Sequence, residues 1–187
     1  MTNPNAFSDV TKAYLCRFYQ ILDEMIRGMT DAELTDSISH NFIVQMIPHH
    51  QAAIDMSRNL LQYTTFVPLQ KIACRIVEEQ SKSIADMTAA LPCCRQLQST
   101  EQDRCLYGRR FQQITRRMFA DMENACAAND INADFMREMI PHHKGAIRMS
   151  ENALCFPVCP ELKPILRSII ASQRAGVREM ERLLRCI

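Results

Sequence analysis

The sequence predicts an all-α protein: a helical bundle of two tandem three-helix repeats with pseudo-two-fold symmetry. Apolar residues recur at helical spacing in six stretches, and no stretch alternates as a strand does. The chain also aligns with itself, without a gap, at an offset of 93 positions. Its 187 residues suit one domain. We therefore expect a single domain over 1–187, with repeat one at 8–93, a linker at 94–100 and repeat two at 101–187.

The repeat is clearest in the segment Met-Ile-Pro-His-His, which occurs at 46–50 and again at 139–143. The match extends in both directions, and roughly a third of the aligned positions are identical, far more than unrelated segments would share. The matching residues include Tyr14, Phe18, Met25, Met29, Gln80, Met87, Leu91 and Cys93 with Tyr107, Phe111, Met118, Met122, Gln173, Met180, Leu184 and Cys186. The pattern indicates a duplicated unit.

Each repeat is expected to contain three helices. The first helix of repeat one covers about 8–29, and the second begins near Asp31 or Asp36, either of which is a suitable N-cap, and ends near 63. Pro48 lies inside this second helix and is expected to kink or divide it. The third opens at Pro68 and carries an apolar face as far as Leu91.

The second repeat predicts helices near 101–127, 130–154 and 161–186. Loops near 64–67 and 155–160 are short, which favours antiparallel neighbours. The two histidine-bearing helices and the two third helices are therefore expected to form a four-helix core, with the remaining pair packed outside.

Composition excludes several classes of function. Lys plus Arg (22) nearly balance Asp plus Glu (21), so we expect no nucleic-acid partner. No apolar run approaches the ~20 residues of a membrane span, and no export signal is visible at 1–16, so we expect a cytoplasmic protein. A homo-oligomer stays an open alternative. We find no phosphate-binding loop and no nucleophile elbow, so we expect no enzyme, no catalytic residue and no organic cofactor.

The chain is rich in methionine (12) and cysteine (9), and four of its five histidines lie in the two repeated segments. On a helix, Met46 lies about 60° and Met56 about 20° from His49, whereas His50 points about 100° away. His49 is therefore expected to work with methionines on its own face, and His50 to meet the other repeat or a second site. Imidazole and thioether donors together suit copper, particularly Cu(I).

Two alternatives compete with a copper site. The first is a structural or interaction bundle whose histidines only form hydrogen bonds in the core, with the methionines as packing. The second is a di-iron site of the ferritin type, which needs Glu three residues before His. Met46 and Met139 hold those positions, so di-iron chemistry is not expected.

The two F-x-x-x-M-I-P-H-H-x-x-A-I-x-M-S segments, each followed by Q-x-x-x-I/V-x-x-M, resemble the domain of unknown function 305 family over nearly the whole chain. The resemblance implies a ferritin-like helical bundle and, from some members, copper binding and resistance. It implies a copper ion held by His49, His50, His142, His143, Met46, Met139, Met56, Met149, Met87 and Met180. The chain departs from the family's pattern at Ser83 and Gly176, where Glu is common.

The cysteines give a weaker second signal. If the ends of the two third helices meet at one pole, Cys93, Cys94 and Cys186 could form a thiolate cluster. The competing interpretation treats Cys16, Cys74 and Cys126 as small buried hydrophobes and the rest as incidental. His40 has no counterpart in repeat two, so it either extends one site alone or is a solvated residue in the first turn of a helix. The function we expect is copper buffering, sequestration or resistance.

Overall fold

The computed structural model describes residues 7–186 and consists there of six α-helices without a strand. Residues 1–6, which belong to the segment where no export signal was predicted, lie outside the described part of the chain, as does Ile187. The helices are α1 (Asp9–Thr30), α2 (Ile38–Leu61), α3 (Val67–Cys94), α4 (Glu101–Glu123), α5 (Ile131–Leu154) and α6 (Leu162–Leu184).

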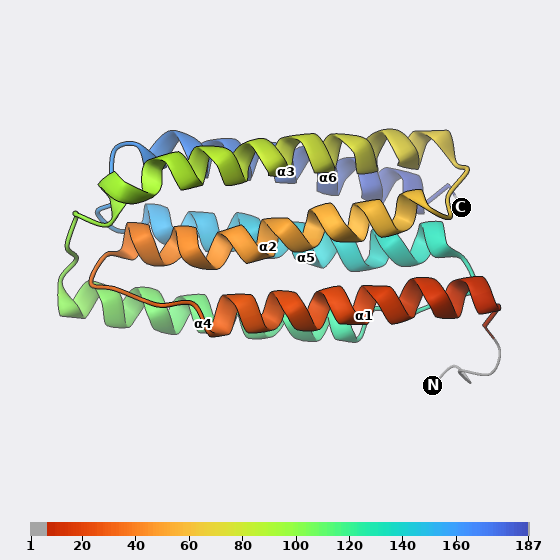
Figure 1. Ribbon diagram of the computed structural model, residues 1–187, viewed down its shortest axis with the longest axis horizontal. Helices are drawn as coiled ribbons and strands as arrows, with labels where there is room; N and C mark the ends of the chain where they lie inside the picture. Colours follow the sequence, from red (N-terminus) through yellow and green to blue (C-terminus); the bar gives the residue numbers. More distant parts are fainter. Residues whose placement is uncertain (1–6, 187) are drawn as a thin grey trace.

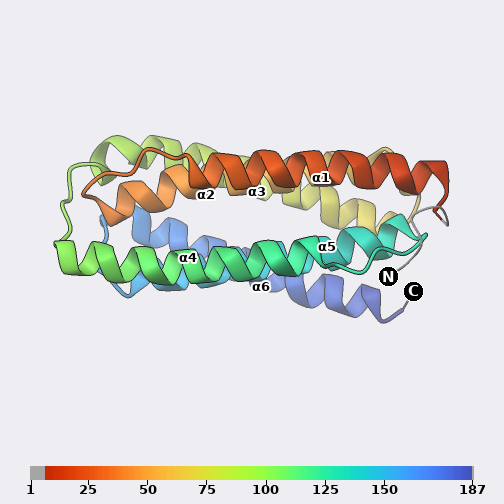
Figure 2. The same ribbon diagram turned by 90° about the horizontal axis from the view of Figure 1, so that it is seen from below.

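The helices lie in three layers of two (Figure 1). The middle layer is α2 and α5, which pack against each other, with α3 and α6 on one side and α1 and α4 on the other. Seen from below, α1 and α4 cover the same face of the molecule (Figure 2). α2, α3, α5 and α6 thus form the expected core, and α1 packs on α2 as α4 packs on α5. Every helix of the middle layer is covered on two sides, so its residues are the most buried.

Several helix ends follow from side-chain caps. Ser8, Thr100 and Asp130 accept hydrogen bonds from backbone N–H groups in the first turns of α1, α4 and α5. The expected cap of α2 was wrong, because Ser37 rather than Asp31 or Asp36 accepts from the His40 N–H, at 3.2 Å. Helix α4 is shorter than expected because it ends at Glu123, where the Asn124 side chain donates to the Ala120 carbonyl.

Pro48 and Pro141 lie inside α2 and α5, and both helices continue through them instead of dividing. The proline in α2 lies against α1. A Cβ placed on Gly28 would lie 2.7 Å from the Pro48 Cβ, so the glycine permits this close approach of the two helices. The segment that carries His49 and His50 therefore begins at a point where the outer helix is tightly packed.

The two halves of the chain make corresponding contacts. The Asn59 side-chain amide donates to the Tyr14 carbonyl at 3.1 Å, and the Asn152 amide donates to the Tyr107 carbonyl at 3.3 Å. Both bonds fix an outer helix to the buried helix beside it. None of the helices in residues 7–186 combines the length and apolar character that crossing a membrane requires.

Candidate metal centre

The two repeated histidine segments meet in the middle layer. The rings of His49 on α2 and His142 on α5 stack, with centroids 3.7 Å apart and planes 27° apart. Both side chains have 0% exposure. The nitrogen lone pairs of an imidazole lie in the ring plane, so the two stacked rings direct their donors toward the edges of the stack rather than at each other. An ion bound here would lie at an edge of the stack.

Both stacked rings are neutral in the folded protein. Burial lowers the pKa of His142 to about 4, and burial together with the neighbouring histidines holds the pKa of His49 well below its ordinary value. His142 Nε2 lies 3.0 Å from the His49 carbonyl oxygen, which can only accept, so the His142 proton is on Nε2. Its Nδ1 then carries a free lone pair. A buried nitrogen in that state is ready to bind a metal without first losing a proton.

The same ring nitrogen is without a partner in all four central histidines. Nδ1 of His49, His50, His142 and His143 is buried and makes no hydrogen bond within residues 7–186. Buried polar atoms are normally paired, because an unpaired one costs about 1–3 kcal/mol. Four unpaired imidazole nitrogens in one region point to a ligand rather than to packing alone.

Met118 supplies a thioether to the stack from α4. Its Sδ lies 3.3 Å from His49 Nε2, and because a thioether only accepts, the ring donates its Nε2–H to the sulfur. Gly145 makes room for it: a Cβ there would lie 2.0 Å from the Met118 Sδ. A surface cavity of about 210 Å³, lined by Met118, Pro141 and Gly145 among others, reaches this side chain. Met118 therefore connects the buried histidine pair with the outside.

Met118 is the residue that sequence reasoning missed. The repeat pairs it with Met25, but helical spacing does not say which face of α4 would meet α5. The available signal was Gly145, a glycine inside a helix where the other repeat has Ala52. A glycine at such a position often marks a close approach by another group.

The methionines expected as ligands are all in the core. Within residues 7–186, Met118 is the methionine whose sulfur makes a hydrogen-bond contact with a histidine. The six methionines that the sequence predicted as ligands have exposures of 0–1% and pack among apolar side chains: Met46, Met56, Met87, Met139, Met149 and Met180. Their role as ligands stays a prediction.

The second histidine of each pair points toward the α3 and α6 layer. His50 Nε2 lies 3.0 Å from the Ser83 Oγ, while Gly176 leaves little room beside His143, since a Cβ there would lie 3.2 Å from Nε2. Ring centroids of His49 and His50 are 6.0 Å apart, so adjacent histidines face different surroundings, as their helical angle predicted. Ser83 and Gly176, where the chain departs from the resemblance, are thus neighbours of the second histidines.

A polar cavity lies on the α3 and α6 side of His50. It has a volume of about 150 Å³ and is lined by His50, Gln80, Ser83 and Gln173 together with other polar residues of both helices. The side-chain oxygens of Gln80 and Gln173 are buried and without a partner in the described chain. This cavity gives His50 the second environment that the sequence predicted.

The cysteine prediction was wrong in its membership. α3 and α6 run in opposite directions, so Cys186 ends α6 at the opposite pole from Cys93 (Figure 1). Cys93 instead meets Cys159 and Glu161, the one group of three His, Cys, Asp or Glu donors within residues 7–186 whose ligand atoms lie close enough to share a metal. Contacts with Cys159 and Glu161 raise the pKa of Cys93 to about 11, and burial raises that of Cys94 to about 12.

Two further expectations also fail. Cys16, Cys74 and Cys126 are exposed rather than buried, because each lies on the outward face of its helix or in a surface loop. His40 is buried rather than solvated, with Nδ1 3.4 Å from the Asn41 Oδ1, because the start of α2 is covered.

Comparison with known proteins identifies relatives. A family model described as "Domain of unknown function (DUF305)" matches residues 21–91 and 95–184. No curated protein matches. A solved DUF305 fragment from Deinococcus radiodurans is 22% identical, covering 80% of this chain and 96% of its own, with a TM-score of 0.58. The family-model match includes both histidine segments, at 46–50 and 139–143.

Two solved forms of CopM are similar as well, each 27% identical to this chain. The Cu(I)-bound form covers 82% of this chain and 97% of its own with a TM-score of 0.57. The Cu(II)-bound form covers 79% and 95% with a TM-score of 0.60.

Proposed function

The chain belongs to the DUF305 family, and we propose that it binds copper as Cu(I) at His49, His142 and Met118. The contact that carries this proposal is the one between His49 Nε2 and the Met118 Sδ, 3.3 Å apart in a buried site. A neutral imidazole and a thioether are soft enough donors for Cu(I), and within residues 7–186 no carboxylate makes a hydrogen bond with either of them. The resemblance to CopM, solved with Cu(I) and with Cu(II), supports the choice of copper.

The donors in the structure fit such an ion. An ion that enters between His49 and Met118 takes the place of the hydrogen now on Nε2, and the ring proton moves to the unpartnered Nδ1. The two donor atoms must separate to admit it. Met118 can move because its side chain has three rotatable bonds and borders the cavity of about 210 Å³. The free Nδ1 of His142 offers a further donor at the same stack.

We further propose that the protein buffers or sequesters the ion rather than catalysing a reaction. Both stacked histidines are fully buried, so a substrate would not reach an ion bound at the edge of their stack. In this proposal the chain is a pair of tandem three-helix units in a ferritin-like arrangement. Equivalent residues of the two units, His49 and His142, then meet at the pseudo-two-fold axis and build one site from both.

A structural role is the second candidate function. The hydrogen bond from His142 Nε2 to the His49 carbonyl joins α2 to α5 and would fix their register without a metal. Met118 separates the two functions, because a scaffold needs its volume whereas a copper site needs its sulfur.

The test replaces Met118 with leucine and compares it with Met25→Leu. Met25 is the repeat-equivalent methionine on α1, has 1% exposure against 2% for Met118, and makes no hydrogen-bond contact with a histidine within residues 7–186. Both changes nearly conserve volume and should cost under ~1.5 kcal/mol. Reduced, chelator-treated protein carrying Cys93→Ser and Cys159→Ser would compete for Cu(I) with a chromophoric chelator. We expect Met118→Leu alone to weaken Cu(I) binding by at least about tenfold, or about 1.4 kcal/mol. Equal affinities in all three proteins would leave the structural role as the better account.

A further inference from the structure

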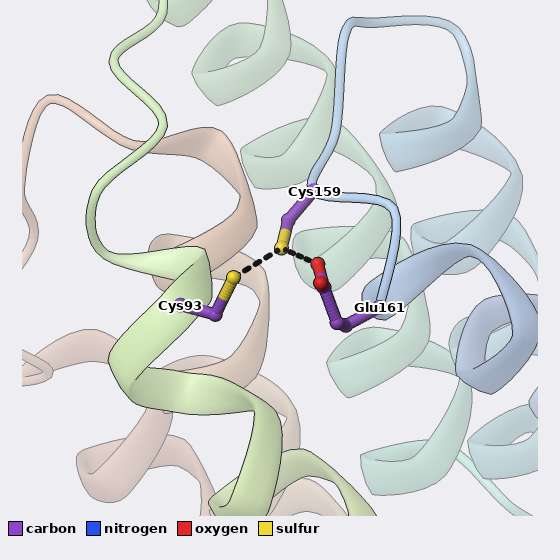
Figure 3. A group of neighbouring side chains, drawn as sticks. All are labelled: Cys93, Cys159 and Glu161. Atoms are coloured by element: carbon purple, nitrogen blue, oxygen red, sulfur yellow. Dashed lines mark hydrogen bonds between the residues drawn. The ribbon is translucent and has the colours of Figure 1, made fainter.

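Three metal-binding side chains converge at the end of the bundle where α3 ends and α6 begins. Figure 3 shows Cys93, Cys159 and Glu161 turned toward one another. The two Sγ atoms are 3.7 Å apart, and the Cys159 Sγ lies 2.7 Å from a Glu161 carboxylate oxygen. All three ligand atoms fall within 4.8 Å of one another. The site lies apart from the stacked histidines and shares no residue with them.

The elements that carry these residues are held by buried contacts. The Cys159 backbone N–H donates to the Ser39 Oγ at 2.9 Å, and the Ser37 Oγ donates to the Cys94 carbonyl at 2.6 Å. Both serines belong to the start of α2. One fixed point therefore positions the end of α3 and the loop before α6 relative to each other, so the two thiols are preorganised.

The spacing of the sulfurs is that of two ligands of one tetrahedral ion. Two thiolates bound at about 2.3 Å in a tetrahedral arrangement lie about 3.8 Å apart. The observed 3.7 Å needs almost no adjustment. Glu161 is closer to Cys159 than a shared ion allows, because its carboxylate now accepts a hydrogen bond from the Cys159 thiol. Its side chain is exposed and can rotate outward when the thiol proton leaves.

The donor set favours zinc. Two thiolates and one carboxylate mix soft and hard donors, which suits Zn²⁺, whereas Cu(I) prefers soft donors and gains little from a carboxylate. The three charges of the deprotonated ligands leave a net charge of about −1 around a divalent ion. Cys93 and Glu161 are exposed, so an ion can enter from solvent, and the buried Cys94 adjoins the cluster.

The duplication does not produce this cluster. At the offset of 93 positions that relates the repeats, Cys186, Phe66 and Pro68 stand in place of Cys93, Cys159 and Glu161. The equivalent positions at the opposite pole thus keep one thiol and no other ligand. The second thiol and the carboxylate, which lie just before the start of α6, belong to repeat two alone, whereas both repeats carry a histidine segment.

We propose that Cys93, Cys159 and Glu161 form a Zn²⁺ site that is separate from the copper centre. Binding forms two zinc–sulfur bonds and one zinc–oxygen bond and releases the two thiol protons to solvent. No oxidation is involved. A bound ion would join the end of α3 to the start of α6.

The experiment uses the full chain, reduced and freed of metal, in competition with a chromophoric chelator for Zn²⁺. The variant Cys93→Ser/Cys159→Ser is compared with Cys155→Ser/Cys186→Ser, which removes two exposed thiols outside the cluster. We expect one Zn²⁺ to bind to the wild type and to the control, and this binding to be lost in the first variant. Glu161→Gln keeps both thiols and should weaken Zn²⁺ binding by roughly tenfold or more. Loss of a residue that only hydrogen-bonds to a metal ligand already weakens metal binding by about that factor.

Cobalt gives a second readout that stability alone does not move. Co²⁺ in place of Zn²⁺ should show thiolate-to-metal charge-transfer absorption in the wild type and the control, and none in Cys93→Ser/Cys159→Ser. Wild-type protein that holds no Zn²⁺ against the chelator would overturn the proposal. Equal Zn²⁺ binding by both double variants would also overturn it. If the cluster variant loses Cu(I) but binds Zn²⁺ normally, the site is a copper–thiolate site and the zinc assignment is wrong.

Discussion

The middle of the bundle and the end where α3 ends and α6 begins present metal-binding side chains in opposite ways. At the middle, His49 and His142 come from equivalent positions of the two repeats, are fully buried and hold no charge. At the end, Cys93, Cys159 and Glu161 come from non-equivalent positions, and two of the three are exposed. In the proposed arrangement of two tandem units, the difference teaches that duplication creates a site on the pseudo-two-fold axis, where a residue meets its own copy. Away from the axis, each pole can change alone.

Lowering the pH should give the largest difference between the two regions, because it should destabilise the protein through the histidines of the middle. The pKa values of the four central histidines are lowered, to about 3 for His50 and about 4 for His142, chiefly by burial. A lowered pKa contributes stability that is present above the ordinary value of about 6.5 and is lost as pH falls toward the folded value. Between pH 6.5 and 5 we expect each of these histidines to remove roughly 1–2 kcal/mol from the free energy of unfolding. Urea titrations of metal-free protein at several pH values measure this loss.

The matched control for acid is His49→Gln/His142→Gln, which should show a shallower decline. Burial raises the pKa of the Glu138 carboxyl, which accepts a hydrogen bond from the Tyr14 hydroxyl. A group with a raised pKa affects stability in the opposite direction, because its contribution to the free energy of unfolding is lost as pH rises. The difference between wild type and variant isolates the histidines, and parallel pH profiles would show that the stack is not the acid-sensitive element.

Zinc bound at Cys93, Cys159 and Glu161 should stabilise the folded protein without involving the stacked histidines or Met118. At a free concentration about 100 times the Kd, a ligand specific for the folded state adds about 2.7 kcal/mol. For a chain of this size that raises the thermal midpoint by roughly 5–10 °C. Calorimetry should show this rise in wild type and in Met118→Leu, and not in Cys93→Ser/Cys159→Ser. A rise in the cysteine variant would place zinc elsewhere.

Two glycine substitutions should sharpen the comparison by acting in opposite directions. Gly108 and Gly145 both lie inside helices, where alanine is intrinsically better by about 0.5–1 kcal/mol. A Cβ on Gly108 meets nothing within 4 Å, so Gly108→Ala should stabilise the protein by that amount. A Cβ on Gly145 would lie 2.0 Å from the Met118 Sδ, so Gly145→Ala should displace Met118, destabilise the protein and weaken Cu(I) binding. Thermal melts and the chelator competition measure both effects, and equal melting shifts would show that Met118 is not confined.

Much of the fold was predictable because each helix shows its buried face as a periodic pattern. The expected opening at Pro68 and the expected range 130–154 agree with α3 and α5, and the histidine segments lie in helices as expected. The start of α2 was left open between Asp31 and Asp36, and its cap was not identified, because Ser37 is an equally acceptable cap and only the packed structure selects it. Family membership was predicted from the two histidine segments and is confirmed.

The site was less predictable because its contacts cross between helices. That His49 and His50 face different surroundings follows from one helix, so the sequence predicted it. The contact between His49 and Met118 depends on how α4 is rotated against α5, which no local pattern records. The pairing of Cys93 with Cys159 rather than Cys186 depends on the opposite directions of α3 and α6. Short loops favour antiparallel neighbours along the chain but do not determine this pair.

The central claim is that copper binds through the Met118 sulfur, and methyl resonances of methionine test it most directly. Protein labelled with ¹³C at the methionine methyl groups, in the Cys93→Ser/Cys159→Ser background, would be titrated with Cu(I) under reducing conditions. Met118→Leu and Met25→Leu assign the two equivalent methyl signals. We expect the Met118 signal to shift and saturate as the first equivalent binds while the Met25 signal stays in place. Tight Cu(I) binding with an unmoved Met118 signal would contradict the account.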